Sequence, residues 1–139
     1  MDRGRGLVYG RRRGRALSPL QRARRETILP RVALTLPRAG RLDPRSLFTT
    51  SPRRIALEIG FGAGEHLAAL AEREGEAGFI GCEVFEGGIV RLLGEIERKN
   101  LTNIRIFADD ARLLLAALEP SSLDRAFLLF PDCFIGLTY

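Results

Sequence analysis

The sequence predicts an α/β fold with a doubly wound, mostly parallel sheet, and three observations support this prediction. Short apolar segments alternate with segments of about 10 to 15 residues in which apolar side chains recur at helical spacing. A glycine-rich loop joins the first apolar segment to the first helical one. The last apolar segment, Ala126–Phe130, is apolar on both faces, as is typical of a central strand in a parallel sheet. This alternation favours right-handed βαβ units.

Residues 18–53 are expected to form a helix followed by a loop. Ser18 and Pro19 have the pattern of an N-cap and a first helical residue. The helix is expected to reach Leu29, because Pro30 would end it. The remainder of this region contains several prolines and a glycine and has the composition of a connecting loop.

Positive charge is concentrated at the start of the chain. Residues 1–54 hold fifteen arginines against three acidic residues, a balance of +12, whereas residues 55–139 have a balance of −7. Residues 1–17 are rich in glycine and arginine, have little to pack, and are expected to form a basic, flexible arm. Arginines neutralise phosphates and release counterions, so the arm indicates a polyanionic partner. A solvated tail without a partner is the alternative.

Residues 54–132 are expected to form the sheet with its helices, and no internal repeat is visible. The carboxyl ends of parallel strands meet at one edge of a sheet, and ligands bind there where the strand order reverses. Polar or glycine residues follow each predicted strand and are expected to share that edge: Gly60, Glu83, Asp109/Asp110 and Asp132. The predicted strands are 54–59, 78–84, 103–108 and 123–130, and the helices lie between the glycine loop and Gly75, at 86–99 and at 111–118.

The glycine loop has the pattern GxGxG, formed by Gly60, Gly62 and Gly64. A dinucleotide site would have a further glycine where Glu65 stands, and an acidic side chain at the start of a helix opposes a pyrophosphate. S-adenosylmethionine has no phosphate and needs a loop without side chains that its methionine and sugar portions can approach. Glu58 is placed to accept a hydrogen bond from the ligand's ammonium, directly or through water. We therefore expect an S-adenosylmethionine site here, with a simple turn as the alternative.

Two further acidic positions follow strands. Glu83 lies 23 residues after Gly60, where such folds place the acidic residue that accepts both ribose hydroxyls; a solvated carboxylate is the alternative. Asp109 and Asp110 precede the third helix, so one is expected to cap it and the other to accept from the adenine amino group. Asp110 is the expected ligand. No further ligand cluster accompanies this pair, so no metal is expected.

Asp132 follows the last strand, next to the place where a sulfonium methyl would be presented. His66, the only histidine, lies in the helix after the glycine loop and is expected to be packed or partly exposed rather than a base.

Cysteine usage and hydropathy indicate the compartment. Cys82 and Cys133 lie far apart with no CxxC pair, which argues against a zinc site or a disulfide framework and fits a reducing compartment. No apolar run approaches the roughly 20 residues of a membrane span. We therefore expect a cytoplasmic protein without membrane contact, in which each cysteine is a small apolar residue.

Several stretches together resemble the tRNA (guanine-N7-)-methyltransferase family, which are class I methyltransferases that use S-adenosylmethionine. The resemblance covers Arg54 to Asp132, preceded by an arginine-rich lead-in, YGRRRGR, like that of bacterial members. The matching stretches are LEIGFGAGEHL, FIGCEV, NLTNIRIFADDA and SLDRAFLLFPD. The resemblance implies a Rossmann-like sheet and methylation of guanine N7 in the variable loop of tRNA. It also implies that Glu58, Glu83 and Asp110 contact the cofactor and that Asp132 is the candidate catalytic carboxylate.

The chain departs from the family after Asp132. The family continues with Pro-Trp, a basic run and further strands that recognise tRNA, whereas residues 133–139 read CFIGLTY. We expect this tail to be unrelated to the fold, the chain to be truncated with impaired activity, and the fourth strand to leave an exposed apolar edge that favours self-association. Two alternatives remain open: a non-catalytic remnant that binds cofactor or RNA without turnover, and a methyltransferase for a small molecule.

Overall fold

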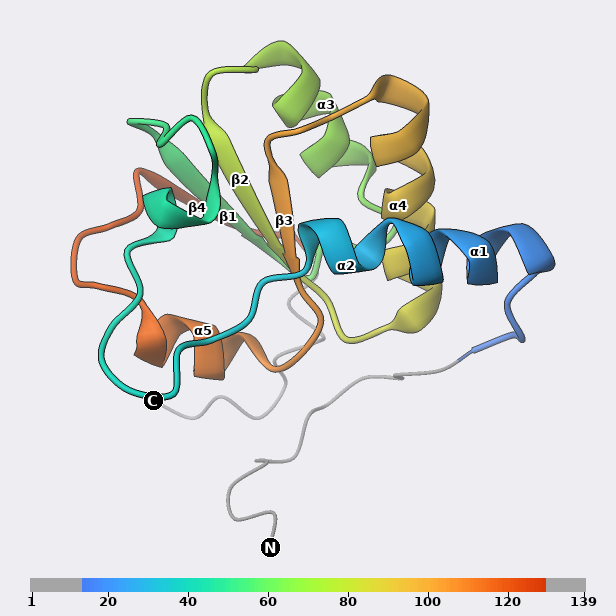
Figure 1. Cartoon of the computed structure of the whole chain (residues 1–139), viewed down its shortest axis with the longest axis horizontal. Coiled ribbons are helices and arrows are strands. Elements are labelled where there is room, and N and C mark those ends of the chain that lie inside the picture. Colours follow the sequence, from blue (N-terminus) through green and yellow to red (C-terminus); the bar gives the residue numbers. More distant parts are fainter. Residues whose placement is uncertain (1–13, 130–139) are drawn as a thin grey trace, which may run out of the picture.

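The computed structural model describes residues 14–129, which form a four-stranded parallel sheet with helices on both faces (Figure 1). The strand order is β3-β2-β1-β4, so the chain steps outward from β1 to β3 and then returns to the other side of β1. This confirms the predicted doubly wound sheet and places the reversal of strand order between β1 and β4. The strands are β1 (Ile55–Ile59), β2 (Gly78–Cys82), β3 (Ile104–Phe107) and β4 (Arg125–Leu128).

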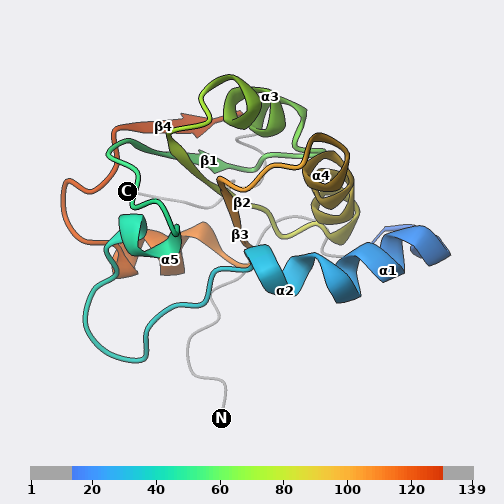
Figure 2. The ribbon, with the colours of Figure 1, turned by 45° about the horizontal axis from the view of Figure 1, so that its top comes forward.

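Two apolar cores lie on opposite faces of the sheet (Figures 1 and 2). On one face α3 and α4 pack against the strands, and α1 lies along α4. On the other face α5 packs together with the segment that follows α2. The helices are α1 (Pro19–Thr27), α2 (Leu29–Val32), α3 (Glu65–Arg73), α4 (Glu86–Lys99) and α5 (Ala111–Ala117), with one 3₁₀ turn, η1 (Pro44–Leu47).

The first predicted helix is divided in two. Ser18 caps α1, as predicted, and the structure adds that it does so in a capping box with Gln21. However, α1 ends at Thr27, and Pro30 lies in the first turn of a second helix, α2, rather than ending the first. The prediction that Pro30 ends the helix was therefore wrong. Proline has no N–H to donate, and this costs nothing in a first turn, where the N–H has no partner within the helix.

The segment after α2 runs beside the outer strand β3. The Leu34 N–H donates to the Ile106 carbonyl at 2.8 Å, and Ala33 forms an isolated parallel bridge with Ile106. Leu34 and Phe48 are buried in the core beneath α5. The loop predicted for this region therefore also covers one face of the sheet and one of its edges.

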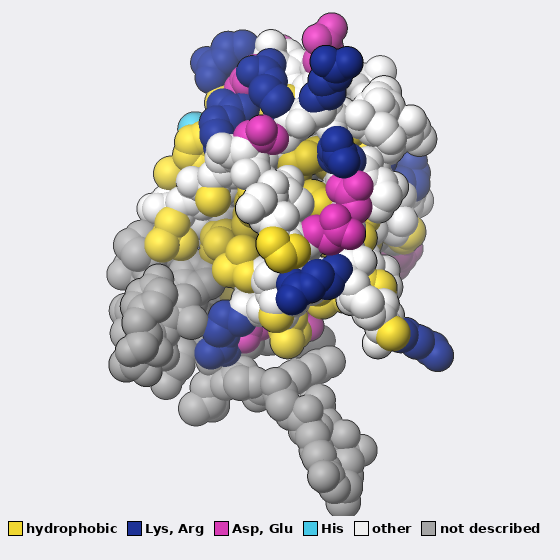
Figure 3. All heavy atoms as spheres, turned by 90° about the vertical axis from the view of Figure 1, so that its left-hand side faces the viewer, with side chains coloured by type: hydrophobic (Ala, Val, Ile, Leu, Met, Phe, Trp, Pro, Cys, Tyr) yellow, Lys and Arg dark blue, Asp and Glu magenta, His cyan; other side chains and the backbone are white. Residues whose placement is uncertain are grey.

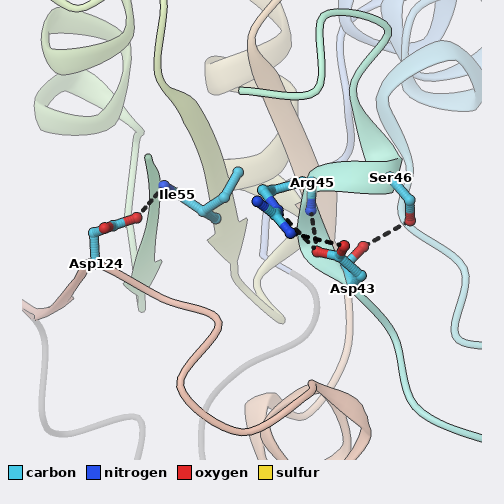
Figure 4. Close-up of polar contacts among 5 residues, drawn as sticks. All are labelled: Asp43, Arg45, Ser46, Ile55 and Asp124. Carbon is cyan, nitrogen blue, oxygen red and sulfur yellow. Dashed lines mark hydrogen bonds and ion pairs between the residues drawn. The ribbon is translucent and has the colours of Figure 1, made fainter. Parts of the chain in front are cut away.

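Two aspartates fix two turns, one at η1 and one before β4 (Figure 4). Asp43 caps η1, where its Oδ1 accepts from the Arg45 N–H at 3.1 Å and its carbonyl accepts from the Ser46 hydroxyl at 2.6 Å. Asp124 Oδ2 accepts from the Ile55 N–H at 2.7 Å. This bond ties the beginning of β1 to the turn before β4, so the two strands that flank the reversal are joined at their amino ends.

Strand β4 is an outer strand of the described sheet, although its apolar sequence predicted a central one. It pairs with β1 alone among the described residues. Leu128 and Leu129 are 54% and 40% exposed, which agrees with the expected apolar edge. Hydrophobic side chains also reach the surface on the face drawn in Figure 3. On α5, Leu113 and Leu115 are exposed. No helix described between residues 14 and 129 is long and apolar enough to cross a membrane.

Candidate functional site

The glycine loop connects β1 to α3 at the carboxyl edge of the sheet. Gly60, Gly62 and Gly64 have φ angles of 70°, 62° and 80°, a backbone conformation that residues other than glycine rarely adopt. The Gly60 N–H donates to the Cys82 carbonyl at 2.8 Å, and the Gly64 N–H donates to the Phe61 carbonyl at 2.9 Å. Each glycine of the predicted motif is therefore required by the backbone, and the loop is tied to the end of β2.

A fourth glycine, Gly88, lies outside the predicted motif and contacts this loop from α4. A Cβ on Gly88, in the first turn of α4, would lie 2.1 Å from the Gly62 carbonyl oxygen. At Gly64 a Cβ would lie 2.6 Å from Leu92 Cδ1 of the same helix. The backbone of α4 thus presses directly on the loop. The Gly87-Gly88 pair inside a predicted helix was the available signal, because glycine there is unfavourable without a packing reason.

Glu58 is buried near the end of β1, with a relative exposure of 1%. Its side chain lies on the α3 face of the sheet, where Oε2 is 2.9 Å from His66 Nδ1. The other oxygen, Oε1, is buried and has no hydrogen-bond partner among the described residues. Burial raises the pKa of the Glu58 carboxyl, and the contact with His66 offsets part of that rise.

Glu83 is also buried, at 6% exposure, but both of its oxygens are bonded. Oε2 accepts from the Gly62 N–H at 3.0 Å, while Oε1 accepts from the N–H groups of Val84 and Phe85 at 2.9 and 3.1 Å. This carboxylate is therefore not a solvated group at a strand end. By binding the next two backbone N–H groups it also ends β2 at Cys82, two residues before the predicted end.

Asp110 follows β3 and caps α5. Its Oδ1 accepts from the Arg112 N–H at 2.9 Å, and the carboxylate forms an ion pair with the Arg112 guanidinium. The Asp109 carboxylate accepts from the Asp110 N–H at 2.7 Å. From the sequence, one of these two aspartates was expected to be the cap and Asp110 to be the ligand. The structure gives the capping role to Asp110 itself, and its ligand role stays a prediction.

The structure gathers these groups at one edge of the sheet. Glu83 binds the glycine loop directly, and Glu83 and Asp110 both lie close enough to Cys82 for their charges to add to the effect of burial, which raises the pKa of that thiol. Cys82 is 2% exposed, in line with its expected role as a small apolar residue. Asp132 lies outside the described residues. Within residues 14–129 no three His, Cys, Asp or Glu side chains are grouped so that they could hold a metal ion.

This edge suits a ligand that carries a cation but no phosphate. The unpartnered Glu58 oxygen calls for a donor, and a positive group satisfies a carboxylate best. The loop is bare of side chains at three positions, so a ligand can approach its backbone. Glu65, the first residue of α3, adds a negative charge where a phosphate-binding helix would have none. These features fit S-adenosylmethionine as the residues stand.

Comparisons with known proteins agree with this geometry. Residues 52–136 match the model of a family described as "Putative methyltransferase". The chain is 48% identical over 126 residues to a tRNA (guanine-N(7)-)-methyltransferase of Paramagnetospirillum magneticum, an alignment that covers 89% of this chain and 53% of the relative. It is 46% and 43% identical to proteins of the same name from Rhodospirillum rubrum (89% and 50% covered) and Nitrobacter hamburgensis (94% and 51%).

The chain spans about half the length of the curated relatives it matches. The family match covers the sheet from the start of β1 onward, including the glycine loop, Glu58, Glu83 and Asp110. The chain therefore belongs to this methyltransferase family.

Proposed function

We propose that this chain carries the S-adenosylmethionine site of a tRNA (guanine-N7-)-methyltransferase. The observation that carries the proposal is the glycine loop held by Glu83, together with the buried carboxylate of Glu58, whose Oε1 has no hydrogen-bond partner among the described residues. The relatives named above supply the reaction and the substrate, because each is named for methylation of guanine N7 in tRNA.

Each carboxylate at the edge has a proposed part in holding the cofactor. Glu58 accepts from the ammonium of the methionine portion through Oε1. Glu83 accepts from the ribose hydroxyls through Oε2, which has one bond to the Gly62 N–H and a second lone pair. Asp110 accepts from the adenine amino group, in addition to capping α5. Gly60, Gly62 and Gly64 give the ligand access to the loop backbone.

The proposed reaction requires the protein mainly to position the two reacting groups. Bound S-adenosylmethionine supplies an electrophilic methyl group on a sulfonium. Guanine N7 presents a lone pair and has no proton to remove, so no strong base is required. The protein must hold the base in line with the methyl group and keep water out. Asp132 is the proposed residue for holding and orienting the guanine.

The charge distribution supports a nucleic-acid substrate. Residues 1–54 have a balance of +12. In α1, Arg24 and Arg25 are paired with Glu97 and Glu86 of α4, so part of this charge is used to dock the helix. The exposed arginines that remain have phosphate as their natural partner. A methyltransferase for a small molecule would have no use for them.

Calorimetry with S-adenosylhomocysteine tests the cofactor half of the proposal on the 139-residue chain. We expect saturable binding that Glu83→Ala weakens at least about tenfold, because the loop loses its acceptor. Glu76→Ala is the matched control, since Glu76 is exposed in the turn before β2. Failure of the folded chain to bind the ligand would contradict the proposal.

The substrate half is tested by incubating the chain with tRNA and labelled cofactor and then looking for N7-methylguanine. We expect methylated tRNA and salt-sensitive tRNA binding that weakens when residues 1–15 are deleted. Cofactor binding without any N7-methylguanine would favour the non-catalytic alternative. Methylation of a nucleoside but not of tRNA would favour a small-molecule enzyme.

A further inference from the structure

His66 lies where three elements of the proposed site meet. It is the second residue of α3, directly after the glycine loop. Its Nδ1 is 2.9 Å from Oε2 of Glu58 on β1. Its ring packs edge-on against Phe127 of β4, with ring centroids 5.2 Å apart and an interplanar angle of 76°. The histidine therefore spans β1 and β4, the two strands between which the strand order reverses.

These contacts fix both the imidazole and the carboxylate. The Phe127 ring holds the plane of the imidazole, so Nδ1 faces Glu58 and Nε2 faces away from it. An ionised carboxylate can only accept, and Nδ1 must then carry the proton of the neutral ring. One Glu58 oxygen is occupied by this bond, and the other has no partner within residues 14–129. The imidazole thus decides which oxygen is available.

We propose that His66 is a positioning residue for the cofactor: by donating from Nδ1 to one oxygen of Glu58, it reserves the other for the ligand's ammonium. This inference rests on the proposed function, since it concerns the same site. A bare buried carboxylate can rotate, take up a proton or bind water. The histidine suppresses the first two outcomes, because its hydrogen bond fixes the rotamer and favours the charged form against the effect of burial.

The charged groups around His66 come from each element that touches it. On β1 the group is Glu58, and on α3 it is the neighbouring Glu65, which is exposed. On β4 it is Arg125, whose guanidinium carbon lies 5.9 Å from the Phe127 ring centroid and which pairs with Glu74. Among the described residues, Glu58 is thus the one charged group bonded to the imidazole.

The first test compares two ligands that differ in the ammonium. S-adenosylhomocysteine carries the amino-acid portion, and 5′-methylthioadenosine lacks it. We expect His66→Ala to weaken S-adenosylhomocysteine about tenfold and to leave 5′-methylthioadenosine within about twofold. His66→Asn, whose amide N–H can replace the Nδ1–H, should restore most of the loss. Glu72→Gln, at an exposed position of the same helix, is the control and should bind both ligands as the unchanged chain does.

Three results would overturn the inference: no effect of His66→Ala on S-adenosylhomocysteine, an equal loss for both ligands, or no rescue by asparagine. An equal loss would mean that the histidine merely supports the fold. If the unchanged chain bound neither ligand, the proposed function itself would fail, and that outcome is distinct from all three.

The second test detects the hydrogen bond between His66 and Glu58 by NMR, without any cofactor. Because the chain has a single histidine, its ring nitrogens give one unambiguous set of ¹⁵N signals. At pH 8 we expect the Nδ1–H tautomer in the unchanged chain and a shift toward the Nε2–H form in Glu58→Ala. A dominant Nε2–H form in the unchanged chain would mean that Nδ1 accepts rather than donates, and the inference would fall.

Discussion

Glu58 and Glu83 lie at the carboxyl ends of neighbouring strands, yet their surroundings differ in what they leave unsatisfied. Glu83 accepts three backbone N–H groups and joins the end of β2 to the glycine loop. Glu58 has one bond, between Oε2 and His66 Nδ1, and its buried Oε1 has no partner among the described residues. The first carboxylate thus builds the site from within, whereas the second holds a reserved acceptor. Both residues are buried, so burial does not distinguish these two roles. The number of hydrogen bonds that each carboxylate makes does distinguish them.

The largest effect is expected from Glu83→Ala. The substitution leaves the partly buried N–H groups of Gly62, Val84 and Phe85 without their acceptor, and we expect the free energy of unfolding to fall by about 3 kcal/mol. Urea unfolding measures this loss, and Glu76→Ala should change it by less than about 0.5 kcal/mol. Equal losses for the two variants would mean that Glu83 does not hold the loop.

A smaller loss is expected from Gly88→Ala, which tests the loop from the side of α4. The new Cβ would lie 2.1 Å from the Gly62 carbonyl oxygen, so the backbone must shift, and we expect a loss of about 2 kcal/mol in the same measurement. Gly94→Ala, in the same helix, meets only the guanidinium at the end of the long Arg24 side chain. It should be neutral or stabilise by up to about 1 kcal/mol. Similar results for both glycines would contradict the close approach.

The smallest effect, of opposite sign, is expected from Glu58→Gln. The pKa of Glu58 is raised above its usual 4.5, so between pH 4.5 and that raised pKa the folded chain holds a proton that the unfolded chain releases. The stability of the unchanged chain should therefore fall as the pH rises from about 4.5 through the raised pKa, and glutamine should avoid this loss. We expect Glu58→Gln to stabilise by roughly 1 kcal/mol at pH 7 and to have no effect near pH 4. A stabilisation that persists unchanged at pH 4 would show that the carboxylate charge is not its cause.

Much of the fold could be predicted from the sequence where the pattern is local. The bounds of α4, residues 86–99, agree with the prediction because a long apolar stripe and a terminal asparagine mark them. The four strands appear where they were predicted, although each is shorter than its apolar run. The glycine loop could be predicted because a left-handed backbone conformation favours glycine, so its positions are visible in the sequence.

What could not be predicted depends on contacts between distant elements. Glu58 and His66 were both singled out, but nothing in their spacing shows that a strand residue and a helix residue eight positions apart share a hydrogen bond. The capping role of Asp110 rather than Asp109 depends on where α5 begins.

The long sequence separation between α1 and its partner has a consequence for the order in which the chain is made. Arg24 and Arg25 pair with glutamates 73 and 61 residues further along, so α1 leaves the ribosome well before α4 exists. A helix with a wide apolar face would be prone to aggregation during that interval. Helix α1 contains no buried residue and docks through charge at its surface. Helix α1 can therefore remain exposed to water until α4 has been synthesised.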